Sequence, residues 1–560
     1  MAAVFVIATA VMLRRTPSEL ANRLPGNLGD SVEVMWILQW GSHAMVHNPL
    51  HIFAANIFWP YPHTLAYADS LLSIAPLYGV LYAVTGQWAL SWNLIWIGLI
   101  LLNLGATYSL ARWLTGRTDA AIFAGLAVGF SAYVLNNAQH PQLELIGFVP
   151  LGFLLLFKLL DRPRWTTAVA LGVVNVIIAF GALYIATGYL IALGILLVGF
   201  TIAIRGHFGR PLVACLAVAG VISLIAAPSI IPYHDVELMY GRRPLSPEWG
   251  LRFQDMVRPT PGSYLYSSLP QGSTSGTAER HAFPGFSTMA LAALGLGVLF
   301  FGRRRRRGAH SHEDHTLPPD RKRYLLLLVI MGAVITILAI GAVADGFPTP
   351  WKLLYNSISP LAGVRVPARL VAFTILTLGV LAAVGLSAVL RRVAQPAARV
   401  AITAVACIVV LVELAAPVSY THIPDDPATL AVYHALSHMP KAPVVELPMF
   451  NPATDPTDWA FGEPSRMVWS TIDYDPTVNG YSGYVTPTYD NDAALFATLP
   501  APAAMTRIRA LKVRYLILHV GVQTDIQMYT PAQAQAIIAG LPTATVHQYG
   551  PNYLVDLGSS

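Results

Sequence analysis

Ten long apolar stretches constrain this chain more than any other feature of its sequence. They lie at residues 88–111, 118–135, 143–160, 166–182, 183–204, 211–232, 284–302, 324–344, 370–390 and 399–417. Each approaches the length of about 20 residues that an α-helix needs to cross a hydrocarbon layer. Only 11% of the 560 residues are charged, compared with roughly a quarter in soluble proteins. A soluble enzyme is therefore excluded, and a polytopic helical membrane protein is predicted.

The opening run, residues 1–13, is short for a membrane span and has the apolar character of a signal-peptide core. It lacks a preceding basic segment and a small-residue cleavage site before Arg14 and Arg15. We therefore expect a first transmembrane helix here, which makes about eleven spans. The apolar piece at 71–86 is then expected to be re-entrant or interfacial. The alternative is that the loop before it lies inside and that residues 1–13 are wrongly assigned.

The basic residues predict an orientation. About half of the 35 Lys and Arg residues fall in five segments that the spans place on one side of the membrane. They are Arg112 and Arg117; Lys158, Arg162 and Arg164; Arg205 and Arg210; Arg303–Arg307 with Arg321, Lys322 and Arg323; and Arg391, Arg392 and Arg399. By the positive-inside rule this side is the cytoplasm.

Cys215 and Cys407 both lie in apolar runs, so no disulfide framework is expected.

The predicted domain boundary falls between residues 417 and 418. Residues 1–417 would form a transmembrane domain with external loops 14–70 and 233–283, and residues 418–560 an external α/β domain. That domain has strand-like runs at 444–447, 514–519 and 553–557, with a helical stretch at 531–539.

The first external loop carries Asp30 and Glu33 at the start of an amphipathic stretch. Its apolar residues recur at helical spacing, which predicts an interfacial helix with aromatic rings toward lipid headgroups. They are Val32, Met35, Trp36 and Trp40. The two carboxylates could act as a general base, or bind a metal, to activate an acceptor hydroxyl. The same spacing equally fits a capping box, with Asp30 as N-cap.

Arginines gather in two other predicted external segments. Loop 233–283 contains five, among them Arg242 and Arg243, against the charge bias that sets the orientation. An anionic ligand such as a phosphate would account for them, and so would surface ion pairs. Arg365 and Arg369 are spaced i, i+4 around Pro367 and could present parallel guanidinium groups to a lipid phosphate. The alternative is that they snorkel at a helix end.

Other polar residues give weaker indications. Four are expected to line the same external cavity: His140, Glu144, Glu279 and His281. His43 and His47 have a zinc-compatible spacing, but no Glu follows His43 as in a metalloprotease motif, so surface histidines are expected.

No Walker A, dinucleotide-binding or nucleophile-elbow motif is present in the sequence, which disfavours ATP-driven transport and serine hydrolysis.

Several motifs together resemble a known family. They are Gly29-Asp30 after the first span, Asn56-Ile57-Phe58-Trp59-Pro60, Arg365–Arg369, Trp469-Ser470-Thr471 and Asn479-Gly480-Tyr481-Ser482-Gly483. Over nearly its whole length the chain resembles bacterial polytopic glycosyltransferases of the GT-C superfamily, in particular members with an external C-terminal domain.

The resemblance implies transfer of a sugar from a polyprenyl-phosphate carrier to a glycan, lipid or protein acceptor at the outer face of the cytoplasmic membrane. It implies that Asp30 is the base or a metal-linked carboxylate. The acid that follows is Glu33 rather than an adjacent residue, so a divalent metal, Mg²⁺ or Mn²⁺, is left open. Arg365 and Arg369, with Arg242 and Arg243, would hold the carrier phosphate. No nucleic acid is expected as a partner.

Two other functions stay open at this point. A flippase for a lipid-linked glycan would need polar residues within spans, and Asn175 and Glu413 are the main ones. A non-catalytic glycan-assembly protein would suit the aromatic segment 474–489, whose rings could stack on carbohydrate.

Overall fold

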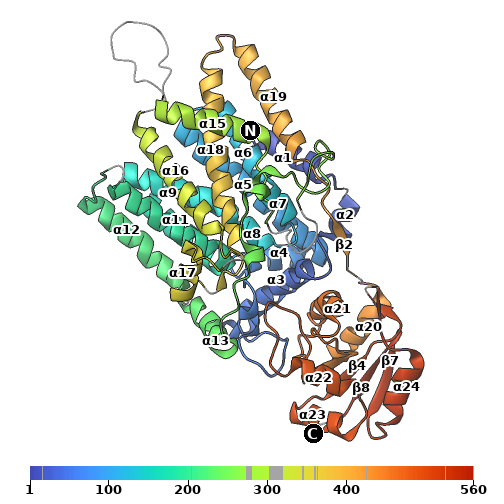
Figure 1. The fold of residues 1–560 in the computed structure, drawn as a ribbon. Coiled ribbons are helices and arrows are strands. Elements are labelled where there is room, and N and C mark those ends of the chain that lie inside the picture. Colours follow the sequence, from blue (N-terminus) through green and yellow to red (C-terminus); the bar gives the residue numbers. More distant parts are fainter. Residues whose placement is uncertain are drawn as a thin grey trace, which may run out of the picture. The chain divides into compact units, whose positions relative to one another are not determined.

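The computed structural model describes residues 1–15, 17–202, 205–272, 280–301, 319–343, 346–358, 361, 363–423, 425–523 and 525–558. The chain divides into two compact units, each described by itself (Figure 1). Unit 1 comprises Met1–Arg15, Ile95–Pro228 and Arg242–Val418. Unit 2 comprises Thr16–Leu94, Ser229–Gly241 and Ser419–Ser560. The predicted boundary at 417–418 stays a prediction.

Unit 1 is built from helices. They are α1 (Ala2–Leu13), α5 (Trp88–Thr115, which begins in unit 2), α6 (Thr118–Gly129), α7 (Ala132–Asn136), α8 (Pro141–Glu144), α9 (Phe148–Asp161), α10 (Trp165–Gly181), α11 (Leu183–Ile202), α12 (Arg210–Ser223), α14 (Phe253–Val257), α15 (Phe286–Phe301), α16 (Pro319–Ala339), α17 (Pro350–Ser357), α18 (Val371–Leu390) and α19 (Pro396–Leu414). Helix α18 packs against α15, α6 and α16, and 94% of its most apolar window is buried. A Cβ on Gly385 would stand 2.0 Å from the carbonyl oxygen of Leu291, so glycine permits the close approach of α15 and α18.

Eight helical stretches among the described residues are long and apolar enough to cross a membrane. They are Trp88–Thr115, Thr118–Asn136, Pro141–Asp161, Leu183–Ile202, Arg210–Tyr240, Arg321–Ala339, Pro367–Leu390 and Pro396–Leu414. The runs predicted at 1–13, 166–182 and 284–302 are also helical, with 12, 17 and 16 residues. The predicted multi-pass helical fold is confirmed, whereas the count of about eleven spans stays a prediction.

Two helical segments bear on the predicted membrane topology. The apolar piece at 71–86 contains an 11-residue helix, α4 (Ala75–Thr85). The helical stretch from Arg210 runs on to Tyr240, so the first residues of the predicted loop 233–283 are helical. The basic run Arg303–Arg307 lies outside the described residues.

The polar residues within the helices of unit 1 are used in packing. Asn175 on α10 donates from Nδ2 to the hydroxyl of Ser223 on α12, at 2.9 Å. Glu413 on α19 accepts from the backbone N–H of Ser287 at 3.0 Å and from the Tyr266 hydroxyl at 2.7 Å. Glu413 thereby satisfies an N–H group at the start of α15. The two residues that a flippase would need therefore have structural partners.

Unit 2 contains a four-stranded sheet, in the order β3 (Val444–Leu447), β4 (Tyr515–Leu518), β8 (Asn552–Asp556) and β7 (Thr545–Tyr549). Strands β3 and β4 are parallel, with Glu446 opposite Ile517, and the other two pairings are antiparallel. The predicted strands at 444–447, 514–519 and 553–557 are all present, so the α/β character is confirmed. Strand β7 was not predicted because it is largely exposed and shows no apolar run.

The helices and the short strands of unit 2 complete this part of the chain. The helices are α2 (Pro17–Asn22), α3 (Asp30–His47), α4, α13 (Ile230–Tyr240), α20 (Pro427–Leu436), α21 (Pro456–Trp469), α22 (Tyr489–Phe496), α23 (Pro502–Ala510) and α24 (Pro531–Ala539). The short strands are β1 (Arg23–Pro25) paired with β2 (Tyr420–His422), and β5 (Val522–Gln523) paired with β6 (Ile526–Gln527). One hydrophobic core joins α20 to the sheet through Tyr433, Val444, Tyr515 and Ile517.

The N-terminal part of unit 2 is bonded to its C-terminal part along the backbone. Phe58 N–H donates to the carbonyl of Asn479 at 3.0 Å, and Trp59 N–H to that of Thr477 at 2.9 Å. Thr477 N–H donates in turn to the carbonyl of Asn56 at 2.7 Å. Two of the segments that carry the family resemblance, 56–60 and 479–483, therefore lie side by side.

Candidate active site

Asp30 is the first residue of helix α3 and does not cap it. Gly29 is the N-cap, and its carbonyl accepts from the N–H groups of Val32 at 3.1 Å and Glu33 at 3.0 Å. Since no side chain caps this helix, the capping-box interpretation is wrong. The half-buried Asp30 carboxylate instead accepts a hydrogen bond from the hydroxyl of Tyr481, at 2.9 Å.

Gly29 lets the start of α3 lie directly against α21. A Cβ at position 29 would stand 3.0 Å from the carbonyl oxygen of Ala460 and 3.7 Å from the Tyr481 hydroxyl. The contact with Ala460 is tighter than ordinary van der Waals packing, so a Cβ here would push α21 away by a few tenths of an ångström. Glycine is therefore the residue that permits Asp30 to reach Tyr481.

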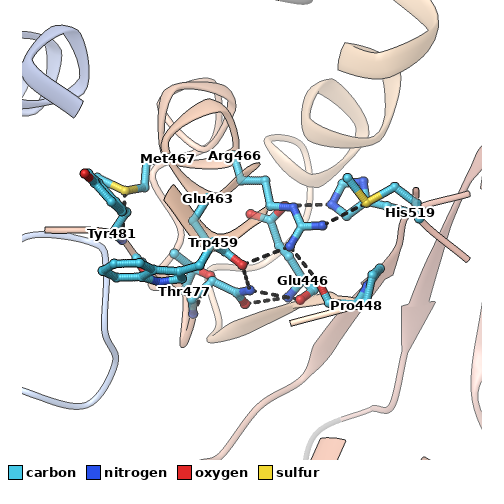
Figure 2. A network of polar contacts seen from close by, with 12 residues as sticks. Glu446, Pro448, Trp459, Glu463, Arg466, Met467, Thr477, Tyr481 and His519 are labelled. Atoms are coloured by element: carbon cyan, nitrogen blue, oxygen red, sulfur yellow. Dashed lines mark hydrogen bonds and ion pairs between the residues drawn. The ribbon is translucent and has the colours of Figure 1, made fainter. Parts of the chain in front are cut away.

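Tyr481 is held from several sides within unit 2. Its ring lies 4.7 Å from the Trp459 indole, with the two planes inclined by 52°. Trp459 on α21 donates from Nε1 to the carbonyl of Gly480 at 2.9 Å. The Tyr481 N–H points at the sulfur of Met467, at 3.2 Å (Figure 2). These contacts fix the ring of Tyr481 and hence the hydroxyl that meets Asp30.

A buried polar network lies behind this loop. Asn479 accepts from the Glu446 N–H at 2.8 Å and donates to the Glu446 carbonyl at 2.9 Å and to Glu463 Oε1 at 3.1 Å. Arg466 donates to the same Glu463 oxygen at 3.0 Å and to the carbonyl of Pro448 at 2.8 Å (Figure 2). The network ties the loop that bears Tyr481 to both α21 and β3.

The charged members of this network are too deeply buried to act on a substrate. Glu463 and Arg466 are no more than 1% exposed, and His519, 2.8 Å from Glu446, is fully buried. Burial raises the pKa of Glu463 to about 7 against the opposing effect of Arg466. Burial also lowers the pKa of His519, because the imidazolium form loses its hydration. We assign these residues a structural role.

Helix α3 is buried more completely than its sequence pattern indicates. Val32 and Met35 are fully buried and Trp36 is 1% exposed, since α3 packs against α4 and α21 (Figure 1). Trp36 donates from Nε1 to Asn56 Oδ1 at 3.2 Å. The predicted placement toward lipid headgroups is therefore wrong for Trp36, which faces protein.

Glu33, the second predicted acid, is 7% exposed in the first turn of α3. Among the described residues, no group of three or more His, Cys, Asp and Glu side chains is arranged to hold a metal ion. The cofactor is therefore not established, and metal binding by Asp30 and Glu33 stays a prediction.

The predicted phosphate-binding arginines belong to unit 1. Arg242 donates to the carbonyl of Asn356 at 3.0 Å, where it satisfies the C-terminal end of α17. Arg243 accepts at its backbone carbonyl from the Tyr355 hydroxyl at 2.7 Å. The guanidinium of Arg242 thus has a structural contact, whereas Arg243 is joined to α17 through its backbone carbonyl.

Arg365 and Arg369 do not share an α-helix. The backbone forms a 3₁₀ turn, η8 (Pro367–Leu370), that begins after Arg365. Arg365 is exposed, whereas the guanidinium of Arg369 lies over the ring of Tyr184, 4.9 Å from its centroid. The i, i+4 geometry expected from their spacing is not formed.

The residues predicted to line the external cavity, His140, Glu144 and His281, also lie in unit 1. Glu279 is outside the described residues. His140 is 7% exposed, His281 9% and Glu144 1%. Neither carboxylate oxygen of Glu144 has a hydrogen-bond partner among the described residues. Arg280, which the sequence analysis did not single out, is 6% exposed and donates to the carbonyl of Glu248 at 3.0 Å. The sequence signal for Arg280 was its position next to His281 in a loop rich in acidic residues.

The fold is shared with solved membrane glycosyltransferases. The chain aligns over its full length with 40% of the arabinofuranosyltransferase AftD from mycobacteria, at a TM-score of 0.57 and 17% identity. A variant of AftD gives 0.58 and 16%, with 42% of its length covered. A weaker similarity, at a TM-score of 0.49 and 12% identity, covers 92% of this chain and 68% of an oligosaccharyltransferase from Archaeoglobus fulgidus. No family model and no curated protein matches.

The chain thus spans about two fifths of the length of AftD. The similarity concerns the fold, because identity is below one fifth. The protein is a multi-pass membrane protein, and the resemblance to GT-C glycosyltransferases that its sequence indicates is confirmed for the fold.

Proposed function

We propose that this protein is a glycosyltransferase that moves a sugar from a polyprenyl-phosphate donor to an acceptor hydroxyl at the outer face of the cytoplasmic membrane. The observation that carries the proposal is the half-buried Asp30 carboxylate at the start of α3, held by the Tyr481 hydroxyl. The fold shared with AftD, named an arabinofuranosyltransferase, supports the same conclusion. The distribution of Lys and Arg supports an outward-facing unit 2.

Asp30 is the general base in this proposal. It lies in the first turn of α3, and the hydrogen bond from the Tyr481 hydroxyl orients its carboxylate. As the acceptor oxygen attacks the anomeric carbon of the donor, its proton passes to Asp30. The bond between that carbon and the phosphate oxygen breaks, and its electron pair leaves with the polyprenyl phosphate. No nucleotide is needed, because the sugar–phosphate bond supplies the driving force.

The leaving phosphate gains negative charge in the transition state and needs a cation nearby. The sequence resemblance assigns this role to Arg365 and Arg369, and within unit 1 Arg365 is the more exposed of the two. Arg242 is a weaker candidate, since its guanidinium already satisfies the end of α17. None of the proposed steps is routed through a metal, and the described residues contain no group of three or more His, Cys, Asp and Glu side chains that could hold one.

The alternatives lose support. A flippase would use Asn175 and Glu413, but both are hydrogen-bonded within helix packing. In a non-catalytic assembly protein the contact between Asp30 and Tyr481 would serve packing alone.

A transfer assay tests the proposal. The purified full-length protein, reconstituted in lipid nanodiscs, is incubated with radiolabelled polyprenyl-phosphate sugars and a panel of glycan, lipid and peptide acceptors. The matched control is Asp425→Asn, since Asp425 is an exposed aspartate of the same unit. Asp30→Asn is expected to lower transfer by about 100-fold or more, with Asp425→Asn near wild type. Wild-type protein that transfers no sugar from any donor contradicts the function.

A further inference from the structure

We propose that Trp459 and Tyr481 form a carbohydrate subsite, so that the acceptor is a glycan and not a lipid or a peptide. This inference rests on the proposed role of Asp30, because it concerns what is brought to that carboxylate. It also gives two particular residues to the carbohydrate stacking that the aromatic segment 474–489 suggests, and ties that stacking to Asp30.

The polar atoms of both aromatic side chains are already used. The indole N–H of Trp459 donates to Gly480, and the hydroxyl of Tyr481 donates to Asp30. Both residues are nevertheless half-buried and not enclosed, although aromatic residues fill the core of this unit elsewhere. What they offer to a ligand is therefore ring surface and not a hydrogen bond.

The two rings are also rigidly placed. Trp459 packs against the buried cluster of Phe450, Ile526 and Met528. Tyr481 is fixed by Trp459 and by Met467 (Figure 2). A surface that is already ordered loses little conformational entropy when a ligand binds, which is the general basis of preorganised recognition.

The inclination of the rings suits a sugar. Their planes meet at 52° with centroids 4.7 Å apart, so they form a bent aromatic surface and not a flat stack. A sugar ring has an apolar C–H face that packs on aromatic carbon, and hydroxyl groups at its edge. A sugar resting on this surface would direct an edge hydroxyl toward Asp30, which Tyr481 itself contacts.

The alternatives fit this surface less well. A peptide backbone brings amide groups that need hydrogen-bond partners, and it has no C–H face like that of a sugar ring to pack on aromatic carbon. A lipid chain would need an extended apolar groove, whereas this surface adjoins a carboxylate.

The test separates binding from chemistry with four variants in nanodiscs. Tyr481→Leu and Trp459→Ala remove aromatic surface, Tyr481→Phe removes only the hydroxyl, and Trp165→Ala is the control, since Trp165 is 70% exposed in unit 1. Acceptors are linear oligosaccharides of arabinofuranose, mannose and glucose, with a matched peptide and a lipid acceptor.

We expect the KM for an oligosaccharide acceptor to rise at least 10-fold in Tyr481→Leu and Trp459→Ala. Tyr481→Phe should lower kcat with a KM near wild type, because its ring is kept. An unchanged acceptor KM in both ring variants overturns the subsite, even if Asp30→Asn is inactive as proposed. Efficient transfer to peptide or lipid alone overturns it as well.

A second measurement needs no variant and no turnover. Hydroxyl-radical footprinting of the wild-type protein, with and without each oligosaccharide, reads the oxidation of Trp459 and Tyr481 by mass spectrometry. At least one oligosaccharide should protect both residues at least threefold and leave Trp165 unchanged. Equal oxidation with every oligosaccharide overturns the subsite whether or not transfer is observed, so the two proposals can fail separately.

Discussion

The hydroxyl of Tyr481 donates a hydrogen bond to the carboxylate of Asp30, at 2.9 Å, across 451 residues of sequence. The bond joins the start of α3 to a loop of the C-terminal α/β region within unit 2. It gives a mutational test in which one oxygen atom is removed while the ring remains.

Tyr481→Phe should lower kcat about 10- to 150-fold, the equivalent of the roughly 1.5–3 kcal/mol that a hydrogen bond to a charged group contributes. The carboxylate would lose the contact that orients it. Steady-state transfer kinetics measure the effect, with Tyr553→Phe as the control. Full activity in Tyr481→Phe would show that the bond has no part in the reaction.

Gly29→Val should weaken unit 2 and lower transfer together. The added atoms would press on the carbonyl of Ala460 and move α3 away from α21. We expect a loss of about 1–3 kcal/mol, typical of overpacking. Hydrogen exchange of residues 456–469 reads the local effect. Gly194→Ala is the control, because nothing lies within 4 Å of a Cβ there. Equal exchange in the Gly29 variant and in wild type would contradict this packing.

The carboxyl of Asp475 should contribute stability to unit 2 as the pH falls from 7 to 5, against the opposing effect of His519, whose pKa is lowered. Burial raises the pKa of Asp475 from 3.8 to about 6, with Lys441 opposing from 3.4 Å. The folded state then binds the proton more tightly than the unfolded state, so stability is lost as the pH rises through this range. Asp475→Asn should therefore reduce the gain on acidification by about 1–2 kcal/mol. Hydrogen exchange at the two pH values, corrected for intrinsic rates, measures the difference. Asp425→Asn is the control, and an unaltered gain in Asp475→Asn would refute the assignment.

Arg365→Ala should raise the KM for the polyprenyl-phosphate donor about 10-fold while the KM for the acceptor stays constant. The reason is the loss of an exposed cation proposed to meet the carrier phosphate. Arg509→Ala, an exposed arginine of unit 2, is the comparison. A donor KM unaffected by Arg365→Ala would exclude this residue from the phosphate site.

The sequence predicted the helices and strands that are marked by a continuous apolar run. Apolar length located the helices of unit 1, and short apolar runs located β3, β4 and β8. Strand β7 was not predicted because its residues are largely exposed, so its sequence shows no apolar alternation.

Features that depend on contacts between residues far apart in the sequence could not be predicted. The face of α3 with Met35 and Trp36 has the pattern of an interfacial helix, and only its packing against α21 shows that it is buried. In the same way, Asp30 has the spacing of a helix cap, and its contact with Tyr481 is long-range. The 3₁₀ turn at Pro367 likewise breaks the spacing that linked Arg365 and Arg369.

The central claim is that Asp30 is the base for sugar transfer, and single-turnover transfer in Asp30→Asn tests it most directly. The enzyme, in excess over a radiolabelled polyprenyl-phosphate sugar, is mixed with saturating acceptor, and the labelled product is followed with time. We predict a rate lower by about 100-fold or more in Asp30→Asn, with donor binding and the thermal unfolding of unit 2 unchanged. A single-turnover rate in Asp30→Asn equal to that of wild type would contradict the account.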